Sequence, residues 1–153
     1  MVCPAAAVES AMDWQTDDPA VRELLTAAAA VRANAYAPYS RYAVGAAVRL
    51  ADGRVVSGCN VENASYGLSL CAERVAIFRA VAEGGLSAGD GAHIVALALV
   101  LDGDPPPTPC GACRQVLAEF ADASCTVYCA NPAGAVRRFT LGELLPAAFS
   151  GPR

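Results

Sequence analysis

The sequence contains no lysine, only one histidine and no long uninterrupted hydrophobic segment. All 11 basic residues are arginine, which excludes an enzyme that depends on a Schiff-base lysine or a Walker lysine. The single histidine excludes any site built from two imidazole side chains. A membrane-spanning helix needs about 20 consecutive apolar residues, and because no such run occurs we expect no membrane association.

Charge and cysteine content narrow the class of protein further. The net charge is −4, so the chain lacks the positive charge with which proteins bind long nucleic acid, and we expect no such partner. Its 7 cysteines are odd in number and widely spread, which differs from a disulfide scaffold and favours the reducing cytoplasm. Residues 1–18 lack the basic start of a secretory signal and are expected to form a flexible N-terminal tail.

The spacing of apolar residues predicts an α/β fold in residues 19–150, which are expected to form a single domain. An Asp52-Gly53 pair between two alternating segments is typical of a β-hairpin. Strands alternating with helices after that hairpin indicate a three-layer sandwich, with a mixed sheet of about five strands between helices. The expected helices are 19–35, 71–83, one that begins near 110, and 141–145, and the expected strands are 42–50, 54–58, 94–101, 125–130 and 136–140.

Three cysteines at the starts of two predicted helices form a candidate metal site. They occur in the motifs Cys71-Ala-Glu73 and Pro109-Cys110-Gly-Ala-Cys113. The positive end of a helix stabilises a thiolate, and sulfur ligands favour zinc over magnesium or calcium. Three ligands leave the fourth zinc position to water, and the nearby Glu73 could act as a general acid and base worth about 10²–10⁴ in rate. The pattern therefore predicts hydrolytic chemistry.

The residues alone leave other interpretations of these cysteines open. A structural site could be closed by Cys59, Cys125 or Cys129, or no metal could bind. Three thiolates around one dication leave negative charge to be offset, and Arg74 and Arg114 are the candidates. Either arginine could equally be a solvated helix residue.

The motifs, taken in order along the chain, resemble those of the cytidine deaminases, in particular the small homotetrameric type with three cysteine ligands to zinc. The similarity covers about residues 20–150, which would then form one catalytic domain. The segments that carry the resemblance are Ala37-Pro38-Tyr39-Ser40, Val44-Gly45-Ala46, Gly58-Cys59-Asn60-Val61-Glu62-Asn63-Ala64, Cys71-Ala-Glu73-Arg74, Pro109-Cys110-Gly-Ala-Cys113-Arg114-Gln115, Leu144-Leu145-Pro146 and Phe149.

The resemblance implies hydrolytic deamination of cytidine and 2′-deoxycytidine to uridine and 2′-deoxyuridine, with release of ammonia, in pyrimidine salvage. It implies that Cys71, Cys110 and Cys113 bind one Zn²⁺ per subunit. Glu73 would shuttle protons beside a zinc-bound hydroxide, and Arg74 would hydrogen-bond the thiolates.

The resemblance also implies a set of substrate-binding residues. Asn60 and Glu62 would hold the ribose hydroxyls, Tyr42 would contact the pyrimidine, and Phe149 would stack on the base. The active sites of the expected homotetramer would be shared, since some pocket walls come from neighbouring subunits. The remaining members of the implied set are Ala64, Tyr66 and Ala72.

Three other functions compete with this interpretation. A deaminase of a modified cytosine nucleoside, such as a blasticidin-type antibiotic, would keep the ring chemistry and change only the recognition of the sugar. Editing of cytosine in RNA or DNA would need a basic groove, which the net charge of −4 disfavours. A zinc-stabilised interaction module would have a closed fourth ligand position and no need of Glu73.

Overall fold

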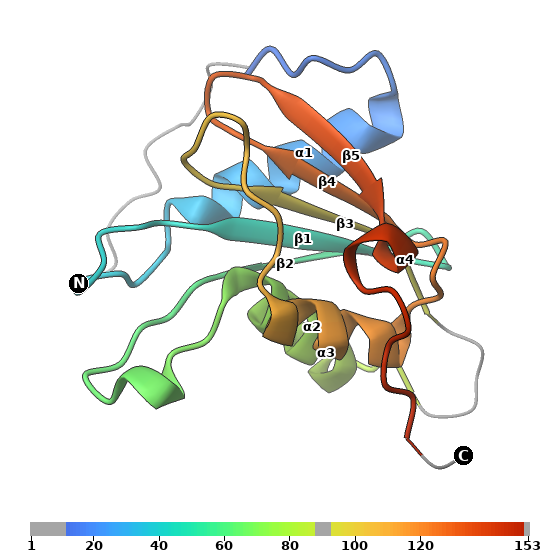
Figure 1. The fold of residues 1–153 in the computed structure, drawn as a ribbon. Helices are drawn as coiled ribbons and strands as arrows, with labels where there is room; N and C mark the ends of the chain where they lie inside the picture. The colour runs from blue at the N-terminus through green and yellow to red at the C-terminus, as the bar shows by residue number, and fades with distance from the viewer. Residues whose placement is uncertain (1–11, 88–92, 152–153) are drawn as a thin grey trace.

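The computed structural model describes residues 12–87 and 93–151, which form a mixed sheet between two helical layers (Figure 1). Helix α1 (Pro19–Arg32) covers one face of the sheet, and α2 (Ala72–Ala82) and α3 (Gly111–Phe120) cover the other. The predicted three-layer α/β sandwich is therefore confirmed. The strands, in their order across the sheet, are β2 (Val55–Cys59), β1 (Gly45–Leu50), β3 (Ile94–Val100), β4 (Thr126–Ala130) and β5 (Val136–Thr140).

Only β3 and β4 run parallel, and every other neighbouring pair in the sheet is antiparallel. A 3₁₀ helix, η1 (Tyr66–Leu68), precedes α2, and a short helix, α4 (Leu141–Leu144), follows β5. The parallel pair matters for the site because β3 must lead through a crossover into α3 before the chain returns as β4. The loop of that crossover carries Cys110 at its end.

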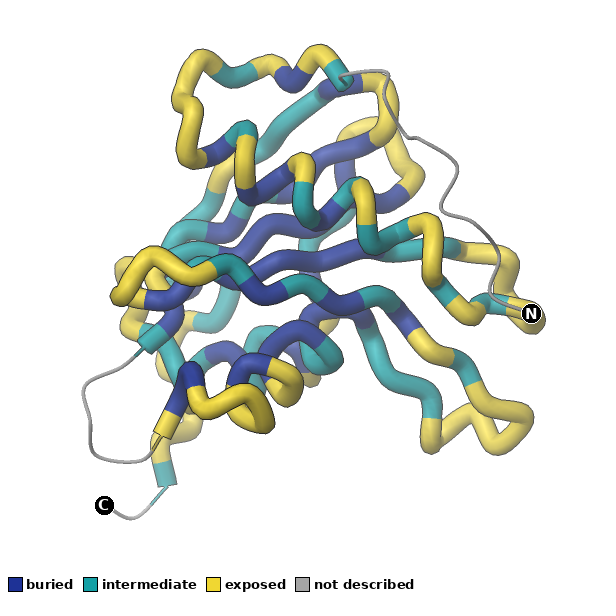
Figure 2. The backbone as a smooth tube through the Cα atoms, turned by 180° about the vertical axis from the view of Figure 1, so that it is seen from behind, coloured by how far each residue is buried: buried dark blue, intermediate teal, exposed yellow. Residues whose placement is uncertain are grey.

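Alternation along the central strands divides the core into two layers, visible as the buried centre of Figure 2. Val48 and Leu97 point toward α2 and α3, in the larger cluster of buried side chains. Ala47 and Ala98 point toward α1, where small side chains allow that helix to pack closely on the sheet.

Two glycines allow helices to approach the strands more closely than any side chain would permit. A Cβ atom on Gly45 would overlap the carbonyl oxygen of Ala28 in α1. A Cβ atom on Gly58 would lie 2.9 Å from both Ala76 Cα and the carbonyl carbon of Val75 in α2. The second contact fixes α2, whose first turn carries Glu73, against β2.

The boundaries of the first strand differ from the expected range 42–50. Strand β1 begins at Gly45 because the side chain of Asn60 forms hydrogen bonds with backbone groups of the residues before it. Its Oδ1 accepts from the Val44 amide and its Nδ2 donates to the Tyr42 carbonyl, both at 2.8 Å. Residues 42–44 therefore form part of a pocket wall instead of a strand.

The start of α1 is as predicted: Pro19 occupies its first turn and Asp18 Oδ1 accepts from the Ala20 amide at 2.9 Å. Residues 1–11 of the expected tail lie outside the described residues. The following segment packs on the domain, because Trp14 is only 3% exposed and the amide of Gln15 donates to the Gly134 carbonyl at 3.0 Å. No helix in residues 12–87 and 93–151 has the length and apolar character needed to cross a membrane.

Candidate active site

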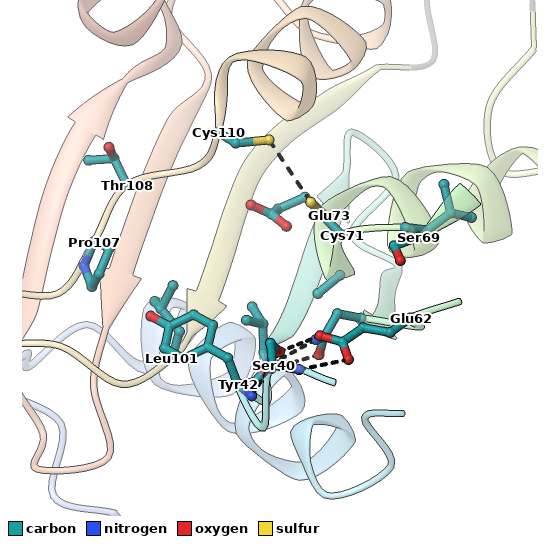
Figure 3. Close-up of a pocket in the computed structure, with 14 residues that line it drawn as sticks. Ser40, Tyr42, Glu62, Ser69, Cys71, Glu73, Leu101, Pro107, Thr108 and Cys110 are labelled. Carbon is teal, nitrogen blue, oxygen red and sulfur yellow. Dashed lines mark hydrogen bonds between the residues drawn. The ribbon is translucent and has the colours of Figure 1, made fainter. Parts of the chain in front are cut away.

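Three cysteine sulfurs from two helix starts converge at one end of α2 and α3. Cys71 is the N-cap of α2 and Cys110 is the N-cap of α3, while Cys113 lies in the first turn of α3. Their Sγ atoms all lie within 4.8 Å of one another, and those of Cys71 and Cys110 are 4.0 Å apart (Figure 3). A tetrahedral zinc ion with Zn–S bonds of about 2.3 Å holds its sulfurs about 3.8 Å apart, so the donor set fits zinc.

The other cysteines of the described chain do not close this site. Cys59, Cys125 and Cys129 are free thiols outside the group of three. Burial raises the pKa of both Cys125 and Cys129 to about 12, as expected of thiols that serve as small apolar core residues. Within residues 12–87 and 93–151, the three-cysteine group is the arrangement that can hold a metal, which disfavours the alternative of a closed four-cysteine site.

Cys71 and Cys113 shift the pKa values of each other's thiols in opposite directions. A hydrogen bond from Cys113, supported by the guanidinium of Arg74, lowers the pKa of Cys71 to about 5. The same hydrogen bond and burial raise the pKa of Cys113, whose thiol holds the shared proton. Hydrogen bonding within the group and the nearby guanidinium therefore favour a thiolate at Cys71, the form in which a cysteine binds a metal.

Glu73 lies beside the sulfurs, with its carboxylate in the same pocket (Figure 3). The residue is only 5% exposed, and this burial raises the pKa of its carboxyl group above the ordinary value. The negative charge of Cys71 raises the pKa further. A raised pKa brings the protonated and ionised forms of the carboxyl group closer in energy, as a group that accepts and returns a proton requires.

The two candidate arginines have different surroundings. Arg74 Nη2 lies 3.6 Å from Cys71 Sγ and 3.5 Å from the Ser69 carbonyl oxygen. Its buried Nε has no hydrogen-bond partner among the described residues. Arg114 donates its side-chain hydrogen bonds to three oxygens, so it does not act as the direct hydrogen-bond donor to sulfur that the sequence allowed.

A cavity of about 360 Å³ opens in front of the cysteines and Glu73. Of the predicted site residues, Tyr42, Asn60, Glu62 and Ala72 line it together with Cys71, Glu73 and Cys110. Seven further residues line the cavity, and the sequence alone indicated no role for any of them, although Ser40 and Val44 lie in the motifs given above. The seven are Ser40, Val44, Ser69, Leu70, Leu101, Pro107 and Thr108.

Glu62 faces the cavity opposite the sulfurs and is held by a tight turn. Its carboxylate accepts hydrogen bonds from the Tyr39 amide at 2.9 Å, from the Ser40 amide at 3.2 Å and from the Ser40 hydroxyl. The Ser40 hydrogen bond is the main cause of the lowered pKa of Glu62. The carboxylate is therefore ionised at neutral pH and retains acceptor capacity for a hydroxyl of a ligand.

Three predicted substrate residues do not join this cavity within one chain. Ala64 is exposed, and Tyr66 is 75% exposed, with its ring packed edge-on against Tyr39 at 5.9 Å between centroids. Phe149 is 77% exposed and lines a different groove, formed with Phe78 and residues of α3. Within one chain, the cavity thus combines the cysteines and Glu73 with a polar wall, and Ala64, Tyr66 and Phe149 lie outside it.

The model of the cytidine and deoxycytidylate deaminase zinc-binding region matches residues 19–129 of the chain. The chain belongs to this deaminase family. It is 49% identical over 127 residues to the cytidine deaminase of Halalkalibacterium halodurans, which covers 83% of this chain and 92% of that protein. It is 48% identical over 117 residues to the cytidine deaminase of Mycobacterium tuberculosis, covering 76% of this chain and 80% of that protein.

Solved structures of the deaminase family have the same fold. The cytidine deaminase of Burkholderia pseudomallei superposes with a TM-score of 0.76 at 50% identity, covering 83% of this chain and 97% of that one. The cytidine deaminase of Mycobacterium tuberculosis superposes with a TM-score of 0.69 at 43% identity, covering 87% and 99%. The family match lies over the three cysteines and Glu73, so the cluster described above lies within its zinc-binding region.

Proposed function

We propose that the protein hydrolyses the exocyclic amino group of cytidine and 2′-deoxycytidine, giving uridine or 2′-deoxyuridine and ammonia, as an enzyme of pyrimidine salvage. The observation that carries the proposal is the convergence of three thiol ligands and a buried carboxyl group in one cavity. Membership in the deaminase family and identities of 48–49% to curated cytidine deaminases support the choice of substrate.

Cys71, Cys110 and Cys113 would hold one zinc ion per subunit, because their sulfurs have the spacing that tetrahedral coordination needs. When bound, zinc supplies Lewis-acid activation of water at its fourth, open position. Arg74, whose guanidinium lies 3.6 Å from Cys71 Sγ, offsets part of the negative charge of the three thiolates.

Glu73 moves the protons of the reaction. Its carboxylate takes a proton from the attacking water and delivers it to the ring nitrogen next to the amino-bearing carbon. A second proton, from the hydroxyl group that the attack adds to that carbon, passes through the same carboxyl group to the amino nitrogen, so that ammonia leaves as the carbonyl forms. The raised pKa of Glu73 suits both transfers, since the protonated and ionised forms are then closer in energy at neutral pH.

The opposite wall of the cavity would hold the sugar. Glu62 presents a fixed carboxylate as a hydroxyl acceptor, and Asn60 retains a second Nδ2 hydrogen as a donor. Tyr42 would contact the pyrimidine, and Ala72, which is fully buried, leaves room for the ring beside Glu73. Ribose is then recognised by polar groups on the side of the cavity away from the reacting carbon.

Neighbouring subunits would complete the pocket in a homotetramer. The exposure of Ala64, Tyr66 and Phe149, which lie outside the cavity of their own chain, supports a shared site. Free thiols at six described cysteines support a reducing compartment such as the cytoplasm. Light scattering of the purified protein tests the assembly, because a site shared between subunits requires an oligomer, which we expect to be a tetramer.

Ultraviolet monitoring of cytidine loss tests the function and the metal together. We expect turnover of cytidine and 2′-deoxycytidine, loss of activity after treatment with a zinc chelator, and recovery when zinc is restored. A large preference for a blasticidin-type nucleoside over cytidine would contradict the assignment. Activity only on cytosine within RNA or DNA, or no deaminase activity in the zinc-loaded protein, would do so as well.

A further inference from the structure

Arg114 joins two segments of the chain on either side of the ligand helix α3. Its Nε donates to the Pro109 carbonyl at 2.7 Å and its Nη2 donates to the Thr108 hydroxyl at 2.8 Å. Its Nη1 donates to the Leu144 carbonyl, also at 2.8 Å, at the end of α4. One planar side chain thus holds both the loop that leads into Cys110 and the C-terminal part of the domain.

The three acceptors lie where regular backbone hydrogen bonding ends. Pro109 and Thr108 lie in the irregular loop after β3, and Leu144 is the last residue of α4, where helical carbonyls lack intrahelical donors. Gln115, the next residue of α3, also holds the C-terminal segment, because its Nε2 donates to the Phe149 carbonyl at 2.9 Å. The segment after Cys113 therefore orders the chain on both sides of α3.

The guanidinium of Arg114 is half-buried, in a position where an arginine is commonly paired with a carboxylate. In residues 12–87 and 93–151, the ion pairs within 4.0 Å include no carboxylate partner for this side chain. Its hydrogen bonds go to neutral oxygens, and it follows Cys113 directly in the sequence. The hydrogen bonds of this guanidinium therefore hold the chain around α3 and do not balance a carboxylate.

We propose that Arg114 is a positioning residue of the zinc site, which fixes the Thr108–Pro109 segment so that Cys110 is held in the geometry of a ligand. The proposal rests on the zinc site of the proposed function. Lysine cannot replace arginine here, because a single ammonium group cannot reach three acceptors that lie in the directions of a guanidinium fork. The side-chain hydrogen bonds of Arg114 go to the loop and to Leu144, and the residue does not line the cavity, so its effect passes through the loop.

The rate of zinc release from the holoenzyme to a chromogenic chelator tests this role without substrate. Arg114→Lys keeps the charge and loses most of the fork, and Thr108→Val removes one acceptor with little change of shape. Arg138→Lys is the matched control, because Arg138 is exposed on β5. We expect zinc release about 10- to 100-fold faster for Arg114→Lys, a smaller increase for Thr108→Val, and no more than about a twofold change for the control.

Thermal unfolding of the metal-free proteins separates positioning from general stability. If Arg114→Lys lowers the stability of the metal-free protein and releases zinc at the wild-type rate, Arg114 is only a structural residue and the proposal is wrong. An Arg114→Ala variant that folds should release zinc at least as fast as the lysine variant. A wild-type protein that binds no zinc would overturn the proposed function itself, which is a different outcome from zinc that is bound and released equally in all variants.

Discussion

Replacing Gly58 with alanine should lower both stability and catalysis, because this glycine sets the distance between β2 and α2. The added Cβ would lie 2.9 Å from two backbone carbons of α2, whereas ordinary contacts begin at 3.4 Å. Backbone atoms cannot turn away as side chains do, so α2 must move by roughly 0.5–1 Å, and overpacking of this kind costs about 1–3 kcal/mol. The moving helix carries Cys71 at its cap and Glu73 in its first turn.

A shift of this size in a reacting group lowers catalysis by as much as about 10²-fold, so we expect kcat/KM for cytidine to fall about 10- to 100-fold. Urea unfolding measures the stability, and absorbance assays on protein of known zinc content measure kcat/KM. Gly67→Ala is the control, because a Cβ there meets no atom within 4 Å. If Gly58→Ala retained wild-type kcat/KM despite reduced stability, the placement of α2 would not govern the chemistry, and the argument would be refuted.

Three further predictions test separate parts of the account. Glu73→Gln should retain zinc, measured by metal analysis, and lower kcat by at least about 100-fold, and wild-type turnover would exclude Glu73 as the proton shuttle. The pKa of Glu62 is lowered mainly by Ser40, so its carboxylate stays ionised as the pH falls. Ser40→Ala removes this hydrogen bond and raises the pKa of Glu62. As the pH falls, KM for cytidine should therefore begin to increase at a higher pH in this variant than in the wild type. Coincident KM–pH profiles of the two proteins would contradict this prediction. Trp14→Ala should destabilise the domain by about 3–5 kcal/mol in denaturant unfolding, and a change below about 1 kcal/mol would show that Trp14 does not pack on the core.

The placement of the three cysteines at helix starts and the order of elements could be predicted because both are local properties of the sequence. Cys71 and Cys110 were expected to begin helices, and in the structure they are the N-caps of α2 and α3, one residue before each helix begins. The sheet followed from the hairpin signal at Asp52-Gly53 and from the strands that alternate with helices. None of these inferences needed contacts between distant residues.

The remaining features depend on contacts between residues far apart in the sequence. Nothing local indicates that Arg114 would donate to the carbonyl of Leu144, 30 residues later, instead of to a sulfur. The strand expected from residue 42 starts later because Asn60 reaches back to Tyr42 and Val44. Trp14 was placed in an expected tail, although one large aromatic side chain is enough to hold such a segment on a core.

X-ray absorption at the zinc edge of the purified protein tests the central claim most directly, because it reports the ligands of the metal without reference to activity. The account predicts three sulfur atoms at about 2.3 Å and one lighter atom, oxygen, in the fourth position. Four sulfur ligands would mean a closed structural site with no place for a reacting water. That result, or a protein purified with no zinc that fails to bind it when supplied, would contradict the account.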